Sequence, residues 1–270
     1  MLAIKNNVMA ENAARFLDQS YGALAKSVQR LSSGLRIVGA QDDAAGLAVR
    51  ELMRADVAVL RQASRNAQDG ISMLQTGEAA MQTIDNLLVR MKELAAQAAT
   101  GTYTTTQTAM MDSEFQEMVD EVDRIAGAVQ FNGTNLLNDD ADVDIQVGTT
   151  DADTITVTLA DVTADGLGID SISIATAASA AAALGTLDSA IAVKDSARAS
   201  FGAKMNRLDA TISVLGVQAE NLVAAESRIS DVDVAREVSI LTRNQVLAQA
   251  GIAMIAQANT MPQLALSLLR

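Results

Sequence analysis

Carboxylates at alternating positions are the feature of this 270-residue sequence that comes closest to a metal site. Asp140, Asp142 and Asp144 have the spacing of the first three ligands in a calcium-binding loop. Such a loop also needs glycine at its sixth position and glutamate at its twelfth, where this sequence has Ile145 and Asp151. Asp alternating with apolar residues is typical of a strand with one solvated face, so we predict no metal site.

Two further motifs have both a functional and a structural interpretation. Asn132-Gly133-Thr134 fits the sequon for N-glycosylation, but Asn-Gly is also a tight-turn signal, and we favour the turn. Gly166-Leu167-Gly168 lacks the third glycine of a dinucleotide-binding loop and does not stand between a strand and a helix. The sequence therefore predicts no cofactor, while its many Ser and Thr residues leave O-glycosylation open.

Composition excludes several classes of chemistry. The sequence contains no His and no Cys, which removes imidazole catalysis, thiol nucleophiles, disulfides and nearly every protein zinc site. Its formal net charge of −13 argues against nucleic acid and anionic membranes as partners. Aromatic residues are only 2% of a chain that is 49% hydrophobic, so Ala, Leu, Val, Ile and Met must form its core. That composition favours thin helical bundles and predicts no enzyme active site.

Neither end of the sequence has the pattern of a targeting or membrane segment. Glu11, Arg15 and Asp18 interrupt the apolar run that a secretory signal requires. The apolar stretch 246–258 contains two glutamines and is too short to span a bilayer. We therefore expect no cleaved signal peptide and no membrane insertion.

The elements that must position these residues are mainly helices. Apolar residues recur at alternating steps of three and four within 10–31, 74–98, 201–222 and 238–255, which is typical of helices that pack side by side. A fifth, shorter helix is predicted over 109–128.

Local signals separate these helices. Gly34 can take a left-handed cap after the first helix, and Asp42 or Asp43 can cap the next. The alternating residues of 143–147 and 155–159 predict two strands of a hairpin. Residues 175–183 are interpreted as a linker or as the frayed start of the following helix.

The order of helices, β insert and helices predicts the fold class. A narrow apolar seam must be covered, and the simplest way is for the chain to double back at the insert. We therefore expect a mainly α protein, a long antiparallel helical coiled-coil or bundle rod with a small β-hairpin insert. Both termini would lie at one end, and the insert would lie outside the helical core and be dispensable.

Several long segments follow one another in a fixed order over roughly 1–138 and 184–270. They are Arg30-Leu31-Ser32-Ser33-Gly34-Leu35-Arg36-Ile37, Asp42-Asp43-Ala44-Ala45-Gly46, Gln62-Ala63-Ser64-Arg65-Asn66-Ala67-Gln68-Asp69-Gly70-Ile71-Ser72, Glu121-Val122-Asp123-Arg124-Ile125, Gln130-Phe131-Asn132-Gly133, Ala225-Glu226-Ser227-Arg228-Ile229-Ser230-Asp231-Val232-Asp233, Gln249-Ala250-Gly251, and the closing Ala256-Gln257-Ala258-Asn259 and Leu266-Ser267-Leu268-Leu269-Arg270. Together and in this order, these segments resemble bacterial flagellin.

The resemblance implies a division of the chain into layers. It implies an inner terminal coiled coil, D0, from 1–42 with 226–270, and a helical rod, D1, from 43–138 with 178–225. Residues 139–177 would be a short variable insert. The D0 assembly seam is expected to contain Leu17, Tyr21, Leu24, Val28, Leu31, Val238, Leu241, Ile252 and Ile255. The D1 core is expected to contain Leu74, Met81, Ile84, Leu88, Met91, Met205, Leu208, Ile212, Leu215 and Leu222.

The resemblance also implies a function and partners. Flagellins polymerise into the extracellular flagellar filament, are exported unfolded by the flagellar type III apparatus, and are held beforehand by a chaperone at the C-terminal segment. Filament cap and hook–filament junction proteins are the other expected partners. A junction protein is itself an alternative interpretation, as is a soluble signalling coiled coil, although the latter does not explain the C-terminal motif. The metallopeptidase found in some flagellins needs a His-Glu-x-x-His helix, which a chain without His lacks.

Recognition by Toll-like receptor 5 is a further family property. The resemblance places its contact residues at Arg90, Leu94 and Glu114, of which the first two are four residues apart on one predicted helix. An arginine on a helix face is more often solvated, or paired with a nearby acid such as Glu93 or Glu114, and this alternative stays open.

Overall fold

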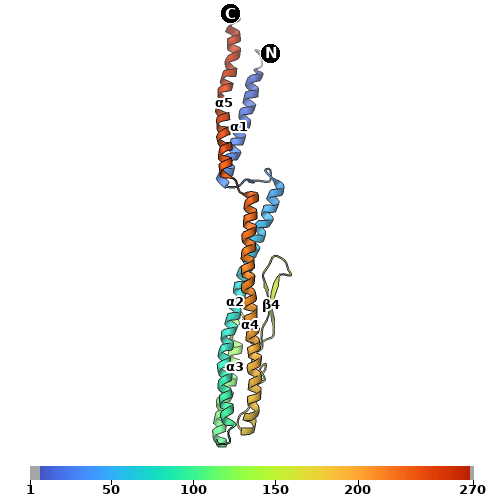
Figure 1. Ribbon diagram of the computed structural model, residues 1–270, viewed down its shortest axis with the longest axis vertical. Coiled ribbons are helices and arrows are strands. Elements are labelled where there is room, and N and C mark those ends of the chain that lie inside the picture. Colours follow the sequence, from blue (N-terminus) through green and yellow to red (C-terminus); the bar gives the residue numbers. More distant parts are fainter. Residues whose placement is uncertain (1–6, 268–270) are drawn as a thin grey trace. The chain divides into compact units, whose positions relative to one another are not determined.

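The structure of the chain is a computed structural model that describes residues 7–267, with only the helical backbone described over 262–267. The ends of the expected D0 segments, 1–6 and 268–270, lie outside the described residues. The prediction of a mainly α fold with a small β hairpin is confirmed (Figure 1). The elements are α1 Val8–Ser33, α2 Ala44–Ala98, α3 Thr105–Ala128, β1 Gln130–Phe131, β2 Thr134–Asn135, β3 Asp142–Gln146, β4 Thr154–Thr158, α4 Ala177–Ser230 and α5 Val234–Ser267.

The chain forms two compact units, each built from both halves of the sequence. Unit 1 contains residues 1–55 and 220–270, and unit 2 contains residues 56–219. The division falls inside α2 and α4, whereas the expected D0 boundaries fall near the ends of those helices. The D0 and D1 boundaries therefore stay predictions, and each unit is described by itself.

Helix ends follow local side-chain chemistry. Gly34, with a φ of 73°, adopts the left-handed cap predicted after α1. Asp43 caps α2, because its Oδ1 accepts a hydrogen bond from the backbone N of Gly46 at 2.9 Å. Thr104 and Gln107 form a capping box that starts α3 earlier than the apolar pattern indicated. Thr176 and Ser179 exchange similar bonds, so α4 begins as a capped helix and 177–183 is not a linker.

The core of unit 2 follows one face of α2 and the helices packed on it. Gly70 and Gly77 permit close packing on α2, since a Cβ at Gly70 would overlap Cδ1 of Ile145 and one at Gly77 would lie 2.8 Å from Cε2 of Phe201. The expected core residues on α4 are less uniform, and Leu222 belongs to unit 1. Leu74, Met81, Ile84, Leu88, Met91, Leu208 and Leu215 are buried, and Met205, Ile212 and Leu222 are partly buried.

The insert is part of this core, which corrects the expectation that it lies outside. β3 and β4 form the hairpin that the alternating pattern predicted, and the structure places Ile145 opposite Ile155 in the antiparallel pair. Their inward side chains join the buried cluster together with Leu159, Val162 and Ile169 beyond the hairpin. The sequence pattern concealed this role because a hairpin can pack a whole face on helices without any heptad spacing. A second, unpredicted two-stranded pair, β1 and β2, flanks the Asn132-Gly133 turn.

A polar stripe of α3 holds the segment that returns to α4. Thr108 Oγ1 donates to the carbonyl of Ala175 at 2.9 Å, and Gln116 Nε2 donates to that of Ile172 at 2.7 Å. The carboxylates of Asp112 and Asp123 accept from the backbone N–H groups of Ile174 and Ala164, both at 2.6 Å. These side chains satisfy the backbone of a segment that has no strand partner. We call residues 164–175 the strap.

Ion pairs join α2 to α4 across unit 2. Arg198 contacts Glu78 at 2.6 Å, which raises the pKa of the arginine. Lys194 pairs with Asp85 and Asp195 and is only 1% exposed, so these carboxylates offset the cost of burying the ammonium group. Lys92 pairs with Asp188 nearer the start of α4. Lys194 and Arg198 are thus the first basic residues after the base-free middle of the chain.

Candidate assembly and recognition surfaces

Unit 1 is built around an antiparallel pair of helices, α1 and α5 (Figure 1). Three contacts fix their register. Asn7 Nδ2 donates to the carbonyl of Ala258 at 2.8 Å, and Arg30 contacts Glu237 at 3.8 Å. Between them, a Cβ on Gly251 would lie 3.2 Å from Cδ1 of Leu17. Position 17 of α1 therefore faces position 251 of α5.

The residues predicted for the D0 assembly seam divide into a partly buried set and an exposed set in the single copy. Five of the expected residues, Leu17, Leu24, Leu31, Leu241 and Ile255, are partly buried along the pair. The other four, Tyr21, Val28, Val238 and Ile252, are exposed in the single copy. The positions covered in their place hold small or polar side chains. Most of them precede an exposed predicted residue by one position in the helix. These are Ala13, Ser20, Ser27, Glu237, Asn244, Gly251 and Ala258.

Small side chains at these covered positions allow the two helices to pack closely. Ser27 is buried, and Ala248 of α5 is buried as well, so the two backbones approach closely. The covered residues and the exposed apolar residues both recur at steps of three and four. Because the prediction used apolar residues alone, it selected the larger ones. The recurrence of Ser20 and Ser27 seven residues apart on α1, and of Asn244 and Gly251 at the same spacing on α5, was the signal that could have identified these covered positions.

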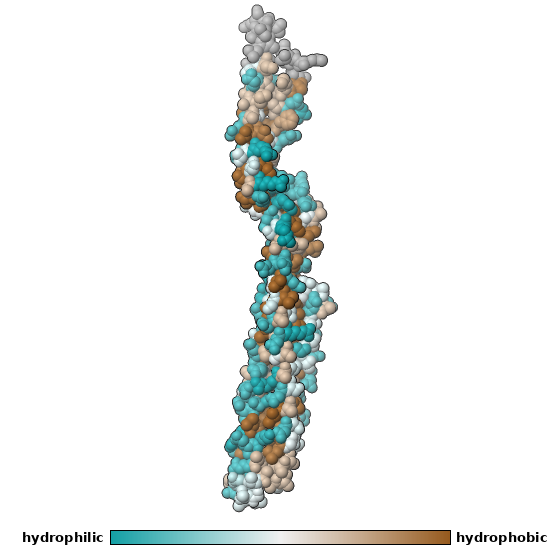
Figure 2. Space-filling view, viewed as in Figure 1, coloured by the Kyte–Doolittle hydropathy of each residue, from teal (hydrophilic) through white to brown (hydrophobic). Residues whose placement is uncertain are grey.

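Large apolar side chains remain on the outside of this pair. Phe16 is 69% exposed, which is unusual for an aromatic residue in a chain with so few. Figure 2 shows such apolar side chains at the surface of the region formed by α1 and α5. The exposed residues are Val8, Met9, Phe16, Tyr21 and Val28 of α1 and Val234, Val238, Val246, Leu247, Ile252, Met254 and Met261 of α5. Exposed apolar surface on this scale indicates a protein–protein interface.

Unit 1 contains two short connections, one from α1 to α2 and one from α4 to α5, and they are hydrogen-bonded to each other. Leu35 and Asp231 form an isolated antiparallel bridge, and the backbone N of Arg36 donates to the carbonyl of Ser230 at 2.6 Å. Arg50 of α2 donates to the carbonyl of Ile37 at 3.1 Å. Ile37 is itself buried, so the connection after α1 is fixed in place rather than solvated.

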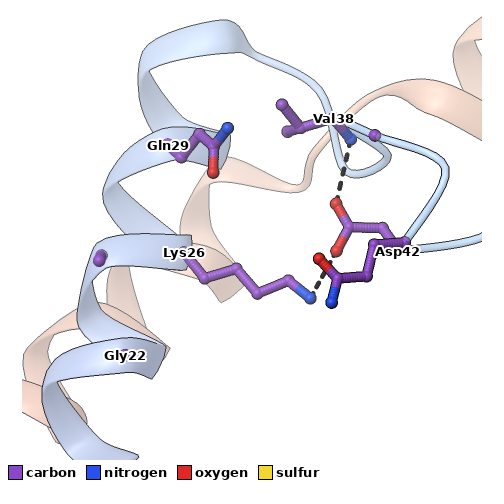
Figure 3. Close-up of a pocket in the computed structure, with 8 residues that line it drawn as sticks. Gly22, Lys26, Gln29, Val38 and Asp42 are labelled. Carbon is purple, nitrogen blue, oxygen red and sulfur yellow. Dashed lines mark hydrogen bonds and ion pairs between the residues drawn. The ribbon is translucent and has the colours of Figure 1, made fainter. Parts of the chain in front are cut away.

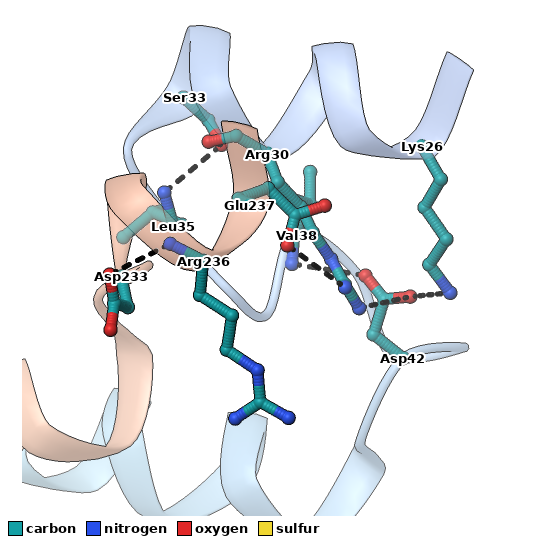
Figure 4. A network of polar contacts seen from close by, with 9 residues as sticks. All are labelled: Lys26, Arg30, Ser33, Leu35, Val38, Asp42, Asp233, Arg236 and Glu237. Atoms are coloured by element: carbon teal, nitrogen blue, oxygen red, sulfur yellow. Dashed lines mark hydrogen bonds and ion pairs between the residues drawn. The ribbon is translucent and has the colours of Figure 1, made fainter. Parts of the chain in front are cut away.

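Charged side chains reinforce these connections (Figure 4). The guanidinium of Arg30 lies between two carboxylates, 3.9 Å from Asp42 and 3.8 Å from Glu237. Asp42 also pairs with Lys26 and accepts from the backbone N of Val38 at 3.2 Å. The hydrogen bond from Lys26 is the main cause that lowers the pKa of Asp42. Sequence reasoning assigned Asp42 only to a possible cap and missed this network.

A hollow of about 630 Å³ lies beside the network, between α1 and the loop that follows it (Figure 3). Gly22, Gln29 and Val38 line it together with the paired Lys26 and Asp42. The two charged groups of the hollow already neutralise each other, so it offers small polar surface and no free charge to a ligand.

The expected receptor residues divide between the surface and the core of unit 2. Arg90 of α2 contacts Glu93 at 3.2 Å and Glu114 of α3 at 3.0 Å, and the hydrogen bond with Glu114 is the main cause that raises the pKa of Arg90. Leu94 is only 2% exposed and belongs to the core cluster. Arg90 and Glu114 therefore lie at the surface while Leu94 belongs to the core, and the receptor contact stays a prediction.

Within residues 7–267, no three acidic side chains converge as a metal site would require. Nor does any helix in that range combine the length and apolarity needed to cross a bilayer. What the geometry offers are surfaces: the apolar flanks of α1 and α5 and the charged patch at Arg90 and Glu114.

Known proteins share both halves of this arrangement. Residues 4–142 match the family model of the bacterial flagellin N-terminal helical region, and residues 184–269 match that of the C-terminal helical region. A flagellin of Halalkalibacterium halodurans is 43% identical over 272 residues, with all of both chains covered. Flagellin FlaB2 of Treponema pallidum is 41% identical over 286 residues, again with all of both chains covered. The crystal structure of Bacillus cereus flagellin is 38% identical, with a TM-score of 0.52, covering 60% of this chain and 94% of that one.

Proposed function

The chain belongs to the bacterial flagellin family, so it is a structural subunit of the extracellular flagellar filament and not an enzyme, and we propose that unit 1 is the part that holds the subunits together. Unit 1 then corresponds to the inner D0 layer and unit 2 to the surrounding D1 layer. One observation carries this assignment: α1 and α5 leave their largest apolar side chains exposed on both flanks of a small-residue seam. Copies packed around a channel would bury these flanks.

A pair of charge substitutions tests the assignment. Phe16→Asp with Leu247→Asp places two charges on exposed positions of one flank without touching the core of unit 2. The doubly substituted monomer keeps the thermal unfolding of unit 2 but fails to elongate sheared filament seeds, as measured by sedimentation and electron microscopy. Met110→Asp, at an equally exposed position of α3, is the matched control and assembles. Normal assembly of the double variant would contradict the proposal.

We propose that the chain reaches the filament through the flagellar type III apparatus in an unfolded state. A chain without cysteine has no disulfide to break or form during passage. Long helices have mostly local contacts, which form quickly once a chain is released. In a strain without the flagellar export gate, the chain should accumulate inside the cell. Fusing a very stable folded domain to it should block secretion in the wild-type strain, and secretion in either case would count against this route.

We propose three classes of protein partner besides the chain itself. The exposed apolar residues of α5, Val246, Leu247 and Met254 among them, would be covered before export by a chaperone that binds the C-terminal segment. Cap and hook–filament junction proteins would contact the same helices at the two ends of the fibre. Calorimetric titration of the chaperone into the full chain should show one site, which is weakened by Leu247→Asp and unaffected by Met110→Asp.

We propose that the Arg90–Glu114 patch contributes to recognition by Toll-like receptor 5. Both side chains are about half exposed and bridge α2 and α3, so they present a fixed charged surface. Leu94 would support this surface from below without contacting the receptor. Arg90→Ala should reduce receptor activation by purified monomer, at a cost of ~1–4 kcal/mol in binding. Arg124→Ala removes a comparable exposed pair with Glu121 and should leave activation unchanged.

The variant Leu94→Ala distinguishes support of the Arg90–Glu114 surface from direct contact with the receptor. Truncation of this buried side chain should lower the stability of unit 2 by ~2–5 kcal/mol. Activation by Leu94→Ala should then recover in proportion to the folded fraction when stabilising osmolyte is added, whereas Arg90→Ala stays weak. Full activation by the Arg90 variant would exclude the patch from the contact.

A further inference from the structure

Most of the exposed methionines of the described chain belong to unit 1. In unit 2, Met81 and Met91 are fully buried. In the described chain the exposed methionines are Met9, Met110, Met254 and Met261, and three of these four belong to α1 and α5. Their exposed fractions are 64% for Met9, 60% for Met254 and 39% for Met261.

These three methionines lie on one flank of the helix pair. Met9 and Phe16 are seven residues apart on α1, as are Leu247, Met254 and Met261 on α5, so each row follows one side of its helix. Phe16 and Leu247 line the same groove, of about 400 Å³, with Gly251 between them. The two rows therefore border the same groove. Because Leu17 faces Gly251, the methionines of both helices lie further along this groove. We call Met9, Phe16, Leu247, Met254 and Met261 the methionine flank.

A second copy of the chain is the occupant that fits this flank. The chain is a filament subunit, and every copy carries both the protruding side chains and the small-residue groove between them. A helical polymer needs such a surface to meet a different surface of the next copy. Methionine side chains suit this contact because they are unbranched and adapt to irregular neighbours.

Exposure in the monomer also makes these thioethers accessible to oxidants. Hydrogen peroxide reacts with a thioether by forming a sulfur–oxygen bond while the oxygen–oxygen bond breaks. The methionine is oxidised to the sulfoxide, and the peroxide is reduced to water. A sulfoxide is polar and accepts hydrogen bonds, so its burial against an apolar neighbour is unfavourable.

We propose that Met9, Met254 and Met261 form a peroxide-sensitive modification site on the face that unit 1 presents to a second copy, so that sulfoxide formation in the monomer blocks assembly. This inference rests on the proposed role of unit 1. Assembly buries the thioethers and protects them, whereas unassembled chains stay open to modification. Whether a subunit can join the fibre would thus depend on whether the methionines of this flank have been oxidised.

Peroxide treatment of full-length monomer, followed by peptide mass spectrometry, tests the site. Met9, Met254, Met261 and Met110 should be oxidised several-fold faster than Met81 and Met91. Elongation of filament seeds should then decrease in proportion to sulfoxide on the methionine flank, with the helical circular dichroism of unit 2 unchanged. In assembled filaments, the three flank thioethers should become protected.

Substitution by leucine separates the flank from other targets. The triple variant Met9→Leu, Met254→Leu, Met261→Leu keeps apolar side chains of similar volume and should assemble after peroxide treatment. Met110→Leu should remain as sensitive as the wild type. The proposal is overturned if flank sulfoxides do not reduce assembly, or if the flank oxidises as fast in filaments as in monomers. Untreated wild-type chain that fails to assemble would instead contradict the proposed function.

Discussion

Units 1 and 2 solve the same problem, the covering of long amphipathic helices, in opposite ways. Unit 2 covers α2 with α3, α4, a hairpin and the strap, and its largest side chains, such as Phe115 and Phe201, are fully buried. Unit 1 is built around a two-helix pair that covers small residues and partly buried leucines, and it leaves large side chains such as Phe16 and Met254 exposed. Burial of apolar surface is the main favourable term in folding, so we expect unit 2 to be stable alone and unit 1 to depend on neighbouring copies.

Among the changes that test the difference between the two units, removal of the insert should have the largest effect on stability and assembly. Replacement of residues 139–170 by a Gly/Ser linker takes the hairpin and most of the strap out of the core, including Ile145, Ile155 and Ile169. Unit 2 should then lose its cooperative unfolding transition, and filaments should not form. Denaturant unfolding followed by circular dichroism, with electron microscopy of secreted material, measures both. Normal filaments from this variant would mean that the helices of unit 2 need no cover.

A single core truncation should act on the two units unequally. Phe115→Ala removes a fully buried ring and should cost ~3–5 kcal/mol. Leu24→Ala, at a partly buried position of α1, should cost only about 1 kcal/mol in the monomer, because part of the side chain is already in water. Equal losses in denaturant titrations of the two monomers would remove the distinction between the units.

Limited proteolysis sharpens the same contrast without any substitution. Protease should cut the monomer within roughly the first and last 40 residues and leave a resistant fragment near 56–219. Assembled filaments should be protected at those sites, because neighbouring copies would cover the flanks of α1 and α5. Mass spectrometry of the fragments identifies the cuts, and ends as resistant as the core would show that unit 1 is stable by itself.

The strap tests how far side-chain contacts stabilise unit 2. Asp112→Ala leaves the hydroxyl of Ser173 and the backbone N–H of Ile174 without their acceptor and should cost ~1–3 kcal/mol. Hydrogen exchange at 172–175 should accelerate. Asp120→Ala, an exposed acid of the same helix, is the control and should leave both values unchanged.

The smallest expected effect concerns acid and the network of unit 1. The pKa of Asp42 is lowered in the folded chain, so its contribution to stability is present above the unfolded pKa of about 4 and is lost as pH falls through the folded pKa. Lys26 and Arg30 face this carboxylate, and Glu237 shares Arg30. Asp42→Asn should reduce the acid sensitivity of unit 1 in pH titrations followed by circular dichroism. An unchanged titration would assign that sensitivity to other acids.

The contrast between the units also explains what could be predicted from the sequence. Heptad spacing predicted the helices, and Gly34 and the alternating residues of 143–159 predicted a cap and a hairpin, because these signals are local. The burial of Leu94 and of the insert depends on elements distant in sequence, which no local pattern specifies. The D0 assembly seam stays a prediction, because the spacing of large apolar residues does not distinguish the face that α1 and α5 cover together from faces left for a second copy.

The way the hairpin is attached has a practical consequence for protein engineering. Asn66 of α2 donates to the carbonyl of Gln146 at 3.1 Å, and Lys204 of α4 donates to that of Thr156 at 2.7 Å, so both strands are anchored on their outer edges. The tip at 149–152 is exposed and makes no contribution to the core cluster. Paired strands hold the two ends of that tip within about 5 Å of each other. A foreign peptide or a small domain with adjacent termini could therefore be grafted there, giving a regular array with one displayed copy per subunit.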